Sequence, residues 1–249
     1  IQLKECMSFD VLVDSLLDKS ADLGVMALEN TIAGSIIPNY ALIDKHNLHI
    51  IDEEYSNIHH HLMALKGQNI QDIKEVWSHP MALLQCKDFF KNYPHIKLVE
   101  DVDTAEVAKR ISKENLVGIA AIAPKIAAEI FDLDIIEDEI QTIKDNSTRF
   151  VIVQTTEPKN GIDQINKASL KFQLDHKRGS LATILNVLSD CKMNLTKIQS
   201  LPVIETPWKY SFFVDITFEE YKDYQKAESI IEIMAEEFKI LGTYKNGRK

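Results

Sequence analysis

Short apolar runs alternate with amphipathic stretches along most of the chain. The segment 22–28 has the length and composition of a buried strand, whereas Phe9–Leu17 places apolar side chains at helical spacing behind Ser8, a suitable helix cap. The same patterns predict further strands at 48–55, 59–65, 76–78, 98–100, 117–121 and 148–154, and helices at 38–46, 80–92, 104–113 and 124–131. Because strands and helices alternate, we expect an α/β fold with a mostly parallel sheet in each lobe.

Two extended passages predict a chain that crosses between two lobes. They lie near Asp52–Ile58 and Gln141–Ser147. The polar segment Thr155–Lys167 contains Pro158 and Gly161 and is typical of a linker. We therefore expect a two-lobed domain over residues 1–156 and a separate domain over residues 168–246.

The region after the predicted linker has the order β-α-β-β-α-β. Its expected elements are Ser169–Leu174, Ser180–Cys191, Leu195–Val203, Tyr210–Phe218, Tyr221–Glu237 and Phe238–Tyr244. This order is typical of an α+β, ferredoxin-like domain.

Charge and cysteine content narrow the classes of function. The net charge of −10 over 249 residues argues against nucleic acid as a partner, and an anion site must be built locally from N–H groups and a few cations. No apolar run is long enough to span a bilayer, and no signal-peptide pattern opens the sequence. The three scattered cysteines favour a reducing compartment, so we expect a cytoplasmic protein with no disulfide framework and no membrane partner.

The strongest candidate chemistry is at Asn146-Ser147-Thr148-Arg149-Phe150, where a β-prone strand begins. Side chains alternate along a strand, so Thr148 and Phe150 should share one face and Arg149 the other. Thr148 can donate a hydrogen bond to a departing oxygen. Two interpretations of Arg149 stay open: a bidentate clamp for a carboxylate, or a structural ion pair with the acidic stretch near Glu137.

Two other segments carry polar groups at strand ends. Leu28-Glu29-Asn30-Thr31-Ile32-Ala33-Gly34-Ser35 should form a turn that presents Asn30 and Thr31, with Glu29 either catalytic or capping the turn. Ser78-His79-Pro80-Met81-Ala82-Leu83-Leu84-Gln85-Cys86 begins a helix whose free N–H groups suit a carboxylate, with Ser78 also a candidate helix cap and Cys86 in the core.

The run His59-His60-His61 invites a metal interpretation. On a strand, only His59 and His61 would share a face, and no carboxylate or cysteine completes a ligand set at helpful spacing. We therefore predict no metal site.

Taken in order, these three motifs resemble the prephenate dehydratase family, and Thr104-Ala105-Glu106 and Gly118–Ala123 also fit. The resemblance implies a fold similar to periplasmic binding proteins and conversion of prephenate to phenylpyruvate in phenylalanine biosynthesis, without a cofactor. It implies Thr148 and Arg149 as catalytic residues, and Asn30, Thr31, Ser78, His79 and Phe150 as substrate-binding residues, with Thr31 standing where the family usually has serine. An arogenate dehydratase and a non-catalytic amino-acid-binding regulator are the alternatives. The family also carries an amino-terminal strand, glycine-rich loop and helix absent from this sequence, so we expect low activity without them.

The C-terminal region resembles an ACT domain, a module that pairs its sheets and binds amino acids between them. The resemblance implies a homodimer or homotetramer and an L-phenylalanine effector site at Gly179, Ser180, Leu181, Gln199, Ser200 and Pro202. Phenylalanine-responsive members carry Glu-Ser-Arg-Pro where this chain has Gln199-Ser200-Leu201-Pro202, so the resemblance implies weakened binding of phenylalanine.

Overall fold

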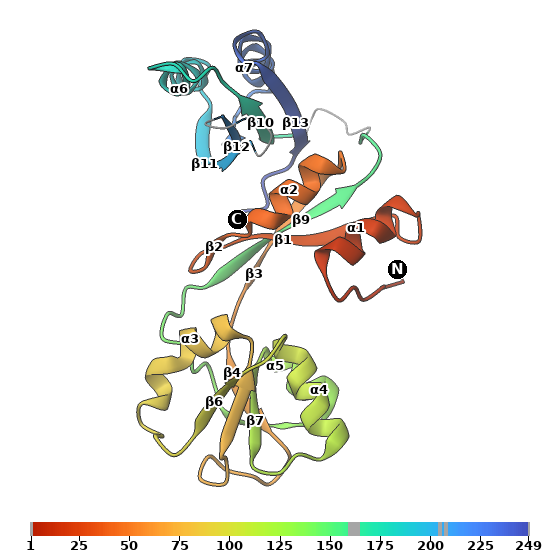
Figure 1. Cartoon of the computed structure of the whole chain (residues 1–249), viewed down its shortest axis with the longest axis vertical. Coiled ribbons are helices and arrows are strands. Elements are labelled where there is room, and N and C mark those ends of the chain that lie inside the picture. The colour runs from red at the N-terminus through yellow and green to blue at the C-terminus, as the bar shows by residue number, and fades with distance from the viewer. Residues whose placement is uncertain (1, 159–164, 204–205, 207–208, 249) are drawn as a thin grey trace. The chain divides into compact units, whose positions relative to one another are not determined.

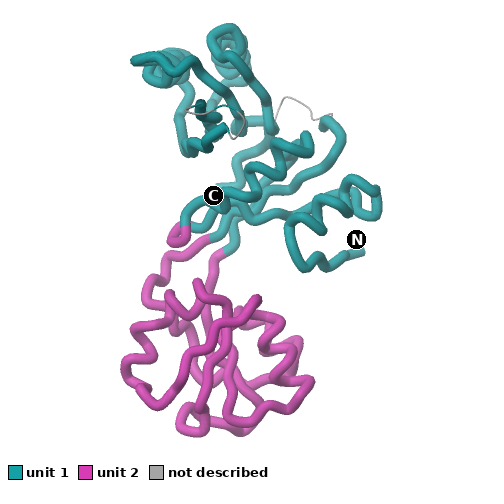
Figure 2. Tube along the Cα trace, in the orientation of Figure 1, with its two compact units in different colours: residues 1–30, 34–56, 148–249 teal, residues 31–33, 57–147 magenta. Residues whose placement is uncertain are grey.

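The computed structural model describes residues 2–158, 165–203, 206 and 209–248. The chain divides into two compact units (Figure 2). Unit 1 comprises Ile1–Asn30, Gly34–Ser56 and Thr148–Lys249, and unit 2 comprises Thr31–Ala33 and Asn57–Ser147. The boundaries at 56–57 and 147–148 fall at the two predicted crossings. Among the described residues, no helix has the length and apolar character needed to cross a bilayer.

Unit 2 is a three-layer α/β structure. Its sheet has the order β6-β5-β7-β4-β8, formed by Lys97–Glu100, Glu75–Ser78, Ile119–Ala123, His61–Ala64 and Asp134–Glu137. β5 runs parallel to β6 and β7, and β4 runs antiparallel to β7 and β8, so only β4 is reversed. The predicted mostly parallel sheet is confirmed for this unit.

Helices cover both faces of the unit 2 sheet (Figure 1). α3 (Pro80–Phe90) lies on one face, and α4 (Thr104–Glu114) and α5 (Lys125–Phe131) lie on the other. The apolar strand β7 serves both layers because its side chains alternate: Ala120 and Ile122 pack in the α3 core, Ala121 and Ala123 in the α4–α5 core.

The first sheet of unit 1 departs from the prediction. Its order is β2-β1-β9-β3, formed by Gly34–Ser35, Gly24–Asn30, Ser147–Gln154 and His49–Asn57, with helices α1 (Phe9–Leu17) and α2 (Ile37–Lys45). β1 pairs antiparallel with both β2 and β9, so the expectation of a mostly parallel sheet was wrong here. The physical reason is the order of the chain crossings: β1 ends at Asn30, where the chain leaves unit 1, and β9 re-enters unit 1 at Thr148, directly opposite Asn30, so the two strands run in opposite directions.

The C-terminal module has the predicted βαββαβ order. It comprises β10 (Lys167–Gln173), α6 (Ser180–Asp190), β11 (Asn194–Pro202), β12 (Tyr210–Thr217), α7 (Tyr221–Met234) and β13 (Glu237–Tyr244). The sheet order is β11-β12-β10-β13 with antiparallel pairs, and α6 and α7 cover one face over a core that includes Phe172 and Tyr224. The predicted linker Thr155–Lys167 includes residues 159–164, which lie outside the described residues.

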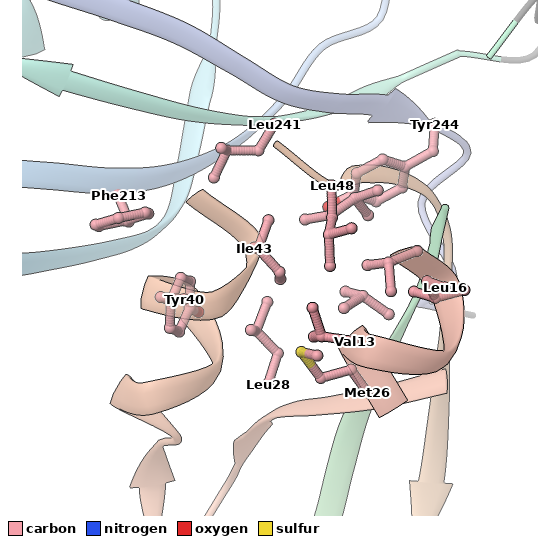
Figure 3. Close-up of a cluster of buried hydrophobic side chains, with 13 residues drawn as sticks. Val13, Leu16, Met26, Leu28, Tyr40, Ile43, Leu48, Phe213, Leu241 and Tyr244 are labelled. Atoms are coloured by element: carbon pink, nitrogen blue, oxygen red, sulfur yellow. The ribbon is translucent and has the colours of Figure 1, made fainter. Parts of the chain in front are cut away.

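The opposite face of the C-terminal module packs on the first sheet, within unit 1. Figure 3 shows Phe213, Leu241 and Tyr244 in one buried cluster with Leu28, Ile43 and Leu48. A β-bulge aims Leu241 into this cluster, because Ser169 pairs with Gly242 and Leu170 with Ile240, leaving Leu241 as the extra residue. The module and the first sheet therefore share a hydrophobic core.

Candidate active site

A β-bulge places two candidate residues side by side in unit 1. Ala27 pairs with Phe150 but Glu29 pairs with Arg149, so Leu28 is the extra residue and is fully buried. After the bulge Asn30 lies directly opposite Thr148, and directly opposed residues of antiparallel strands share a face. Asn30 Nδ2 donates to Thr148 Oγ1 over 3.0 Å. Thr148 is the acceptor in this bond, so its own hydroxyl proton is not consumed by it.

Arg149 occupies the other face of β9, as strand alternation predicts. Its side chain is 3% exposed and every guanidinium nitrogen donates within the protein: Nε to Glu53 over 2.6 Å, Nη1 to Asp215, and Nη2 to the Tyr244 hydroxyl over 2.8 Å. These contacts favour the ion-pair interpretation over the carboxylate clamp. The expected partner near Glu137 was wrong, because strand pairing brings Glu53 and Asp215 to Arg149 from distant parts of the sequence.

The charges around Arg149 are balanced. Lys167 Nζ lies 2.8 Å from both carboxylate oxygens of Glu53, and Ser169 donates to Asp215. Burial by itself raises the pKa of Asp215, but Arg149 and Lys167 outweigh it and hold that pKa below its usual value. Breaking such a buried pair by removing one partner costs about 3–5 kcal/mol, because the other charge stays buried.

Glu29 also contacts the C-terminal module. Its carboxylate lies 2.8 Å from the Lys197 ammonium, whose side chain is 10% exposed. The two sequence interpretations of Glu29, a catalytic group or a turn cap, did not anticipate this ion pair. Phe150, half-buried, follows Thr148 on the same face of β9 and pairs with Ala27.

The candidates at the start of α3 lie in unit 2. Ser78 is fully buried and donates its hydroxyl proton to the Ile122 carbonyl over 2.7 Å. The helix is capped by His79 rather than by Ser78, and His79 Nδ1 accepts from the Met81 N–H over 3.2 Å. Since that donor is a backbone N–H, a neutral His79, which is an exposed residue, carries its proton on Nε2.

A second polar network in unit 2 was not foreseen from the sequence. The Gln85 side-chain oxygen lies 2.8 Å from His60 Nε2 and accepts from Asn146 Nδ2 over 3.0 Å. Both residues lie in motifs that the sequence analysis had singled out, Gln85 in the helix motif and Asn146 in the strand motif, but their contact with each other was not predicted. Thr31 joins the same strand motif, with its N–H donating to the Ser147 carbonyl and its hydroxyl accepting from the Ser147 N–H.

The other two histidines of the run have carboxylate neighbours. His59 Nδ1 lies 3.3 Å from Glu139, and His61 Nδ1 lies 3.0 Å from Asp138. Within the residues that the structure describes, no group of three or more His, Cys, Asp or Glu side chains is arranged to hold a metal ion.

The predicted effector residues lie at one end of the C-terminal module. Gly179 precedes α6 with φ of 87°, Ser180 begins that helix, and Leu181 packs against the module core. Gln199, Ser200 and Pro202 are on β11, at the edge of the sheet. Their role in binding an effector stays a prediction.

The fold and these contacts define an α/β protein in which the Asn30 amide binds the Thr148 hydroxyl, next to a β-bulge and at the start of strand β9. A sequence profile described as prephenate dehydratase matches residues 1–158, more than half of the chain. The chain therefore belongs to the prephenate dehydratase family.

Individual relatives agree with this assignment. The chain is 35% identical to arogenate dehydratase/prephenate dehydratase 2, chloroplastic, of Arabidopsis thaliana, over 96% of this chain and 65% of the relative. It is 32% identical to a bifunctional chorismate mutase/prephenate dehydratase of Buchnera aphidicola, over 85% of this chain and 55% of the relative. The chain thus spans between about half and two thirds of the length of these relatives.

Solved structures show the same fold. Prephenate dehydratase of Arthrobacter aurescens in complex with L-Phe superposes with a TM-score of 0.84 at 23% identity, covering 97% of this chain and 81% of that chain.

Proposed function

We propose that this protein is a prephenate dehydratase, which removes carbon dioxide and water from prephenate to give phenylpyruvate in phenylalanine biosynthesis. The observation that carries the proposal is the Asn30–Thr148 contact, because it holds a hydroxyl donor in a fixed orientation within the family's strand motif. Arogenate dehydratase is the second candidate, since the Arabidopsis relative carries both names.

The proposed reaction needs one well-placed donor. The bond between the ring carbon and its carboxylate breaks, its electron pair enters the ring, and the ring hydroxyl leaves from the opposite carbon. Thr148 donates a hydrogen bond to that departing oxygen, and aromatisation drives the step. A threonine hydroxyl is a weak acid, so Thr148 stabilises the developing charge or relays a proton rather than acting as a full general acid.

Asn30 has a positioning role in this mechanism. Its N–H occupies a lone pair of Thr148 Oγ1, which restricts the hydroxyl to directions in which the proton points at another acceptor. Arg149 has no role at the substrate, because its guanidinium nitrogens already bind Glu53, Asp215 and Tyr244.

Carboxylate recognition is assigned to groups in unit 2. His79 Nε2–H can donate to an anionic oxygen, and the positive end of the α3 dipole favours an anion there. The N–H groups of the first turn are already bound, because Pro80 has none, Met81 donates to His79 Nδ1, and Ala82 and Leu83 donate to the His79 carbonyl. Ser78 contributes at most its lone pairs, since its proton is bound to Ile122. Thr31 and Phe150 stay proposed substrate-binding residues.

The C-terminal module is proposed to be an ACT domain. Its βαββαβ topology and the exposed edge strand β11 support this assignment. We propose that it binds L-phenylalanine near Gly179–Leu181 and Gln199–Pro202 and joins subunits into a homodimer or homotetramer. The Arthrobacter prephenate dehydratase, solved in complex with L-Phe, supports the choice of effector.

The test is direct turnover by the native protein. Incubation with prephenate should yield phenylpyruvate, followed by its absorbance in alkali, without added nucleotide or metal. A parallel incubation with arogenate, followed by phenylalanine formation, distinguishes the second candidate. A folded protein that binds amino acids tightly but converts neither substrate would instead be a regulator.

A further inference from the structure

Two cross-strand pairs of opposite charge face each other within unit 1. Glu29 and Arg149 lie directly opposite on β1 and β9, and Lys197 and Asp215 lie directly opposite on β11 and β12. Glu29 binds Lys197 over 2.8 Å, and Arg149 binds Asp215. These four residues, the charge clasp, therefore join the first sheet to the C-terminal module through two ion pairs.

The charge clasp is adjacent to the candidate catalytic pair. Glu29 precedes Asn30 on β1, and Arg149 follows Thr148 on β9, so each clasp residue of the first sheet shares a peptide bond with a member of the pair. Alternation puts the two sets of side chains on opposite faces of the same two strands. A displacement of the backbone at Glu29 or Arg149 would therefore also displace the neighbouring Asn30 or Thr148.

The segment of β1 next to Glu29 is weakly fixed by its own strand pairing, so the ion pairs of the charge clasp can contribute to holding it in place. The bulge at Leu28 disrupts the ladder immediately before Glu29, and bulged segments have fewer hydrogen bonds to fix their register. Three of the clasp side chains are nearly buried: Arg149 is 3% exposed, Asp215 4% and Lys197 10%. At such sites charge pairs are screened little by salt, and their geometry is fixed by the surrounding contacts.

We propose that Glu29 and Arg149 are positioning residues, which Lys197 and Asp215 hold so that Asn30 and Thr148 keep the geometry required for catalysis. The inference rests on the proposed function, in which Thr148 donates to the departing hydroxyl. It makes β11 and β12 of the C-terminal module part of the support of the catalytic strand.

The chain offers a matched control. Lys171 of β10 also joins the C-terminal module to the first part of unit 1, through Asp44 at 2.7 Å, and it binds Glu237 within the module at 2.7 Å; its side chain is 7% exposed. Asp44 belongs to α2 and Glu237 to β13, so this ion cluster has no described contact with β1 or β9.

The experiment compares Lys197→Met, Lys197→Arg and Lys171→Met in the full-length protein. Lys197→Met should lower kcat about tenfold, the scale of a small misplacement of a catalytic group, while KM changes by less than about twofold. Lys197→Arg keeps the charge and should retain most of kcat. Lys171→Met should lower the melting temperature but leave kcat unchanged. Glu29→Gln, which preserves side-chain shape at a position that is 36% exposed, replaces Lys197→Met if that variant does not fold.

Equal loss of kcat in Lys197→Met and Lys171→Met, or unchanged kcat in Lys197→Met, would overturn the proposal. A second readout does not depend on the substrate: hydrogen–deuterium exchange of the backbone amides at 147–150. Exchange there should be faster in Lys197→Met and unchanged in Lys171→Met, and equal rates in both would also overturn it. If wild-type protein turns over neither substrate, the proposed function fails, while the exchange data still decide whether the clasp fixes β9.

Discussion

Thr148 is on a buried strand, 9% exposed, with its oxygen bound by an amide from the neighbouring strand. The arrangement separates two tasks that one residue cannot perform alone. In the proposed mechanism Thr148 is the hydrogen-bond donor to the departing oxygen, and Asn30 restricts the direction in which the Thr148 hydroxyl proton points. At the residue scale, activity should therefore depend on the hydroxyl itself and not on the volume of the side chain.

The isosteric change Thr148→Val removes the hydroxyl and keeps the β-branched shape. We expect kcat for prephenate to fall about a hundredfold or more, the scale for loss of one aimed donor, with a smaller change in KM. Thr148→Ser should recover much of the loss. Steady-state kinetics of the two variants measure this, and similar, near-normal rates in both would remove Thr148 from the mechanism.

His60 should make the stability of unit 2 sensitive to acid. Burial lowers the pKa of His60 below its ordinary value of 6.5, so the folded state resists the proton that the unfolded state binds. Its contribution is therefore fully present above about pH 6.5 and is lost as pH falls towards the lower folded pKa, by at most about 1.4 kcal/mol per pH unit.

Urea unfolding from about pH 8 to about pH 5 measures this dependence. His60→Gln should flatten the decline in the free energy of unfolding below about pH 6.5. His95→Gln, at an exposed position of the same unit, is the control. An unchanged slope in His60→Gln would show that other groups set the acid sensitivity.

At the element scale, periodicity predicted the C-terminal module closely, because each of its elements is bounded by a turn and has a clear apolar face. It failed for the first sheet of unit 1. An apolar strand such as β9 has the same pattern whether its neighbour is parallel or antiparallel, and the order of chain crossings decides the direction. The bulge at Leu28 left no signal either, because an extra apolar residue in an apolar run is indistinguishable from its neighbours.

The candidate site was predictable to a similar extent. The residue types and the opposite facing of Thr148 and Arg149 followed from alternation. The partners of Arg149 did not, because Glu53 and Asp215 are separated from it by 96 and 66 residues and come from two other strands. Local patterns hold no information about such pairings.

The close packing of β13 on β3 gives a further prediction at this scale. A Cβ atom added to Gly242 would lie 2.0 Å from the Ile50 carbonyl oxygen, which is backbone and cannot move aside cheaply. Gly242→Ala should therefore destabilise unit 1 by about 3 kcal/mol or more. Gly67→Ala has open space but φ of +80°, so it should cost only about 1–2 kcal/mol. Thermal unfolding measures the loss of stability in both variants. Equal losses would show that β13 and β3 move apart easily enough to accept the added methyl group.

At the scale of the whole molecule, the C-terminal module and the first sheet form one compact unit with a common core. If the module binds phenylalanine, the free energy of binding stabilises the same compact unit that contains Thr148. The module has its own core beneath α6 and α7, but it also contributes Phe213, Leu241 and Tyr244 to the core of the first sheet, unlike a regulatory domain attached only by a linker.

Phenylalanine binding is testable by calorimetry with phenylalanine, tyrosine and tryptophan. Gly179 has φ of +87°, and a Cβ added to it would meet no described atom within 4 Å, so a ligand has room to approach the backbone there. Gly179→Val should abolish or strongly weaken phenylalanine binding, whereas Gly67→Val, another glycine with positive φ, should not. Tight binding that survives Gly179→Val would place the effector site elsewhere.

The three cysteines are distributed so that each unit has its own chemical reporter. Cys86 is fully buried in the α3 core of unit 2, and burial raises the pKa of its thiol to about 12. Cys6 and Cys191 are half-buried and belong to unit 1. Because the thiolate is the nucleophile, an alkylating reagent should modify Cys6 and Cys191 in the native protein and reach Cys86 only when unit 2 unfolds.

Mass spectrometry of the intact protein, labelled for increasing times in low urea, should thus separate a fast class of thiols from one slow thiol. The rate at Cys86 would report the opening of unit 2 alone, and ligand-induced changes in that rate would show which unit a ligand stabilises. Labelling of Cys86 as fast as that of Cys191 would mean that unit 2 opens without global unfolding. The labelling rate of the natural residue Cys86 therefore measures the unfolding of unit 2, and no introduced cysteine is needed.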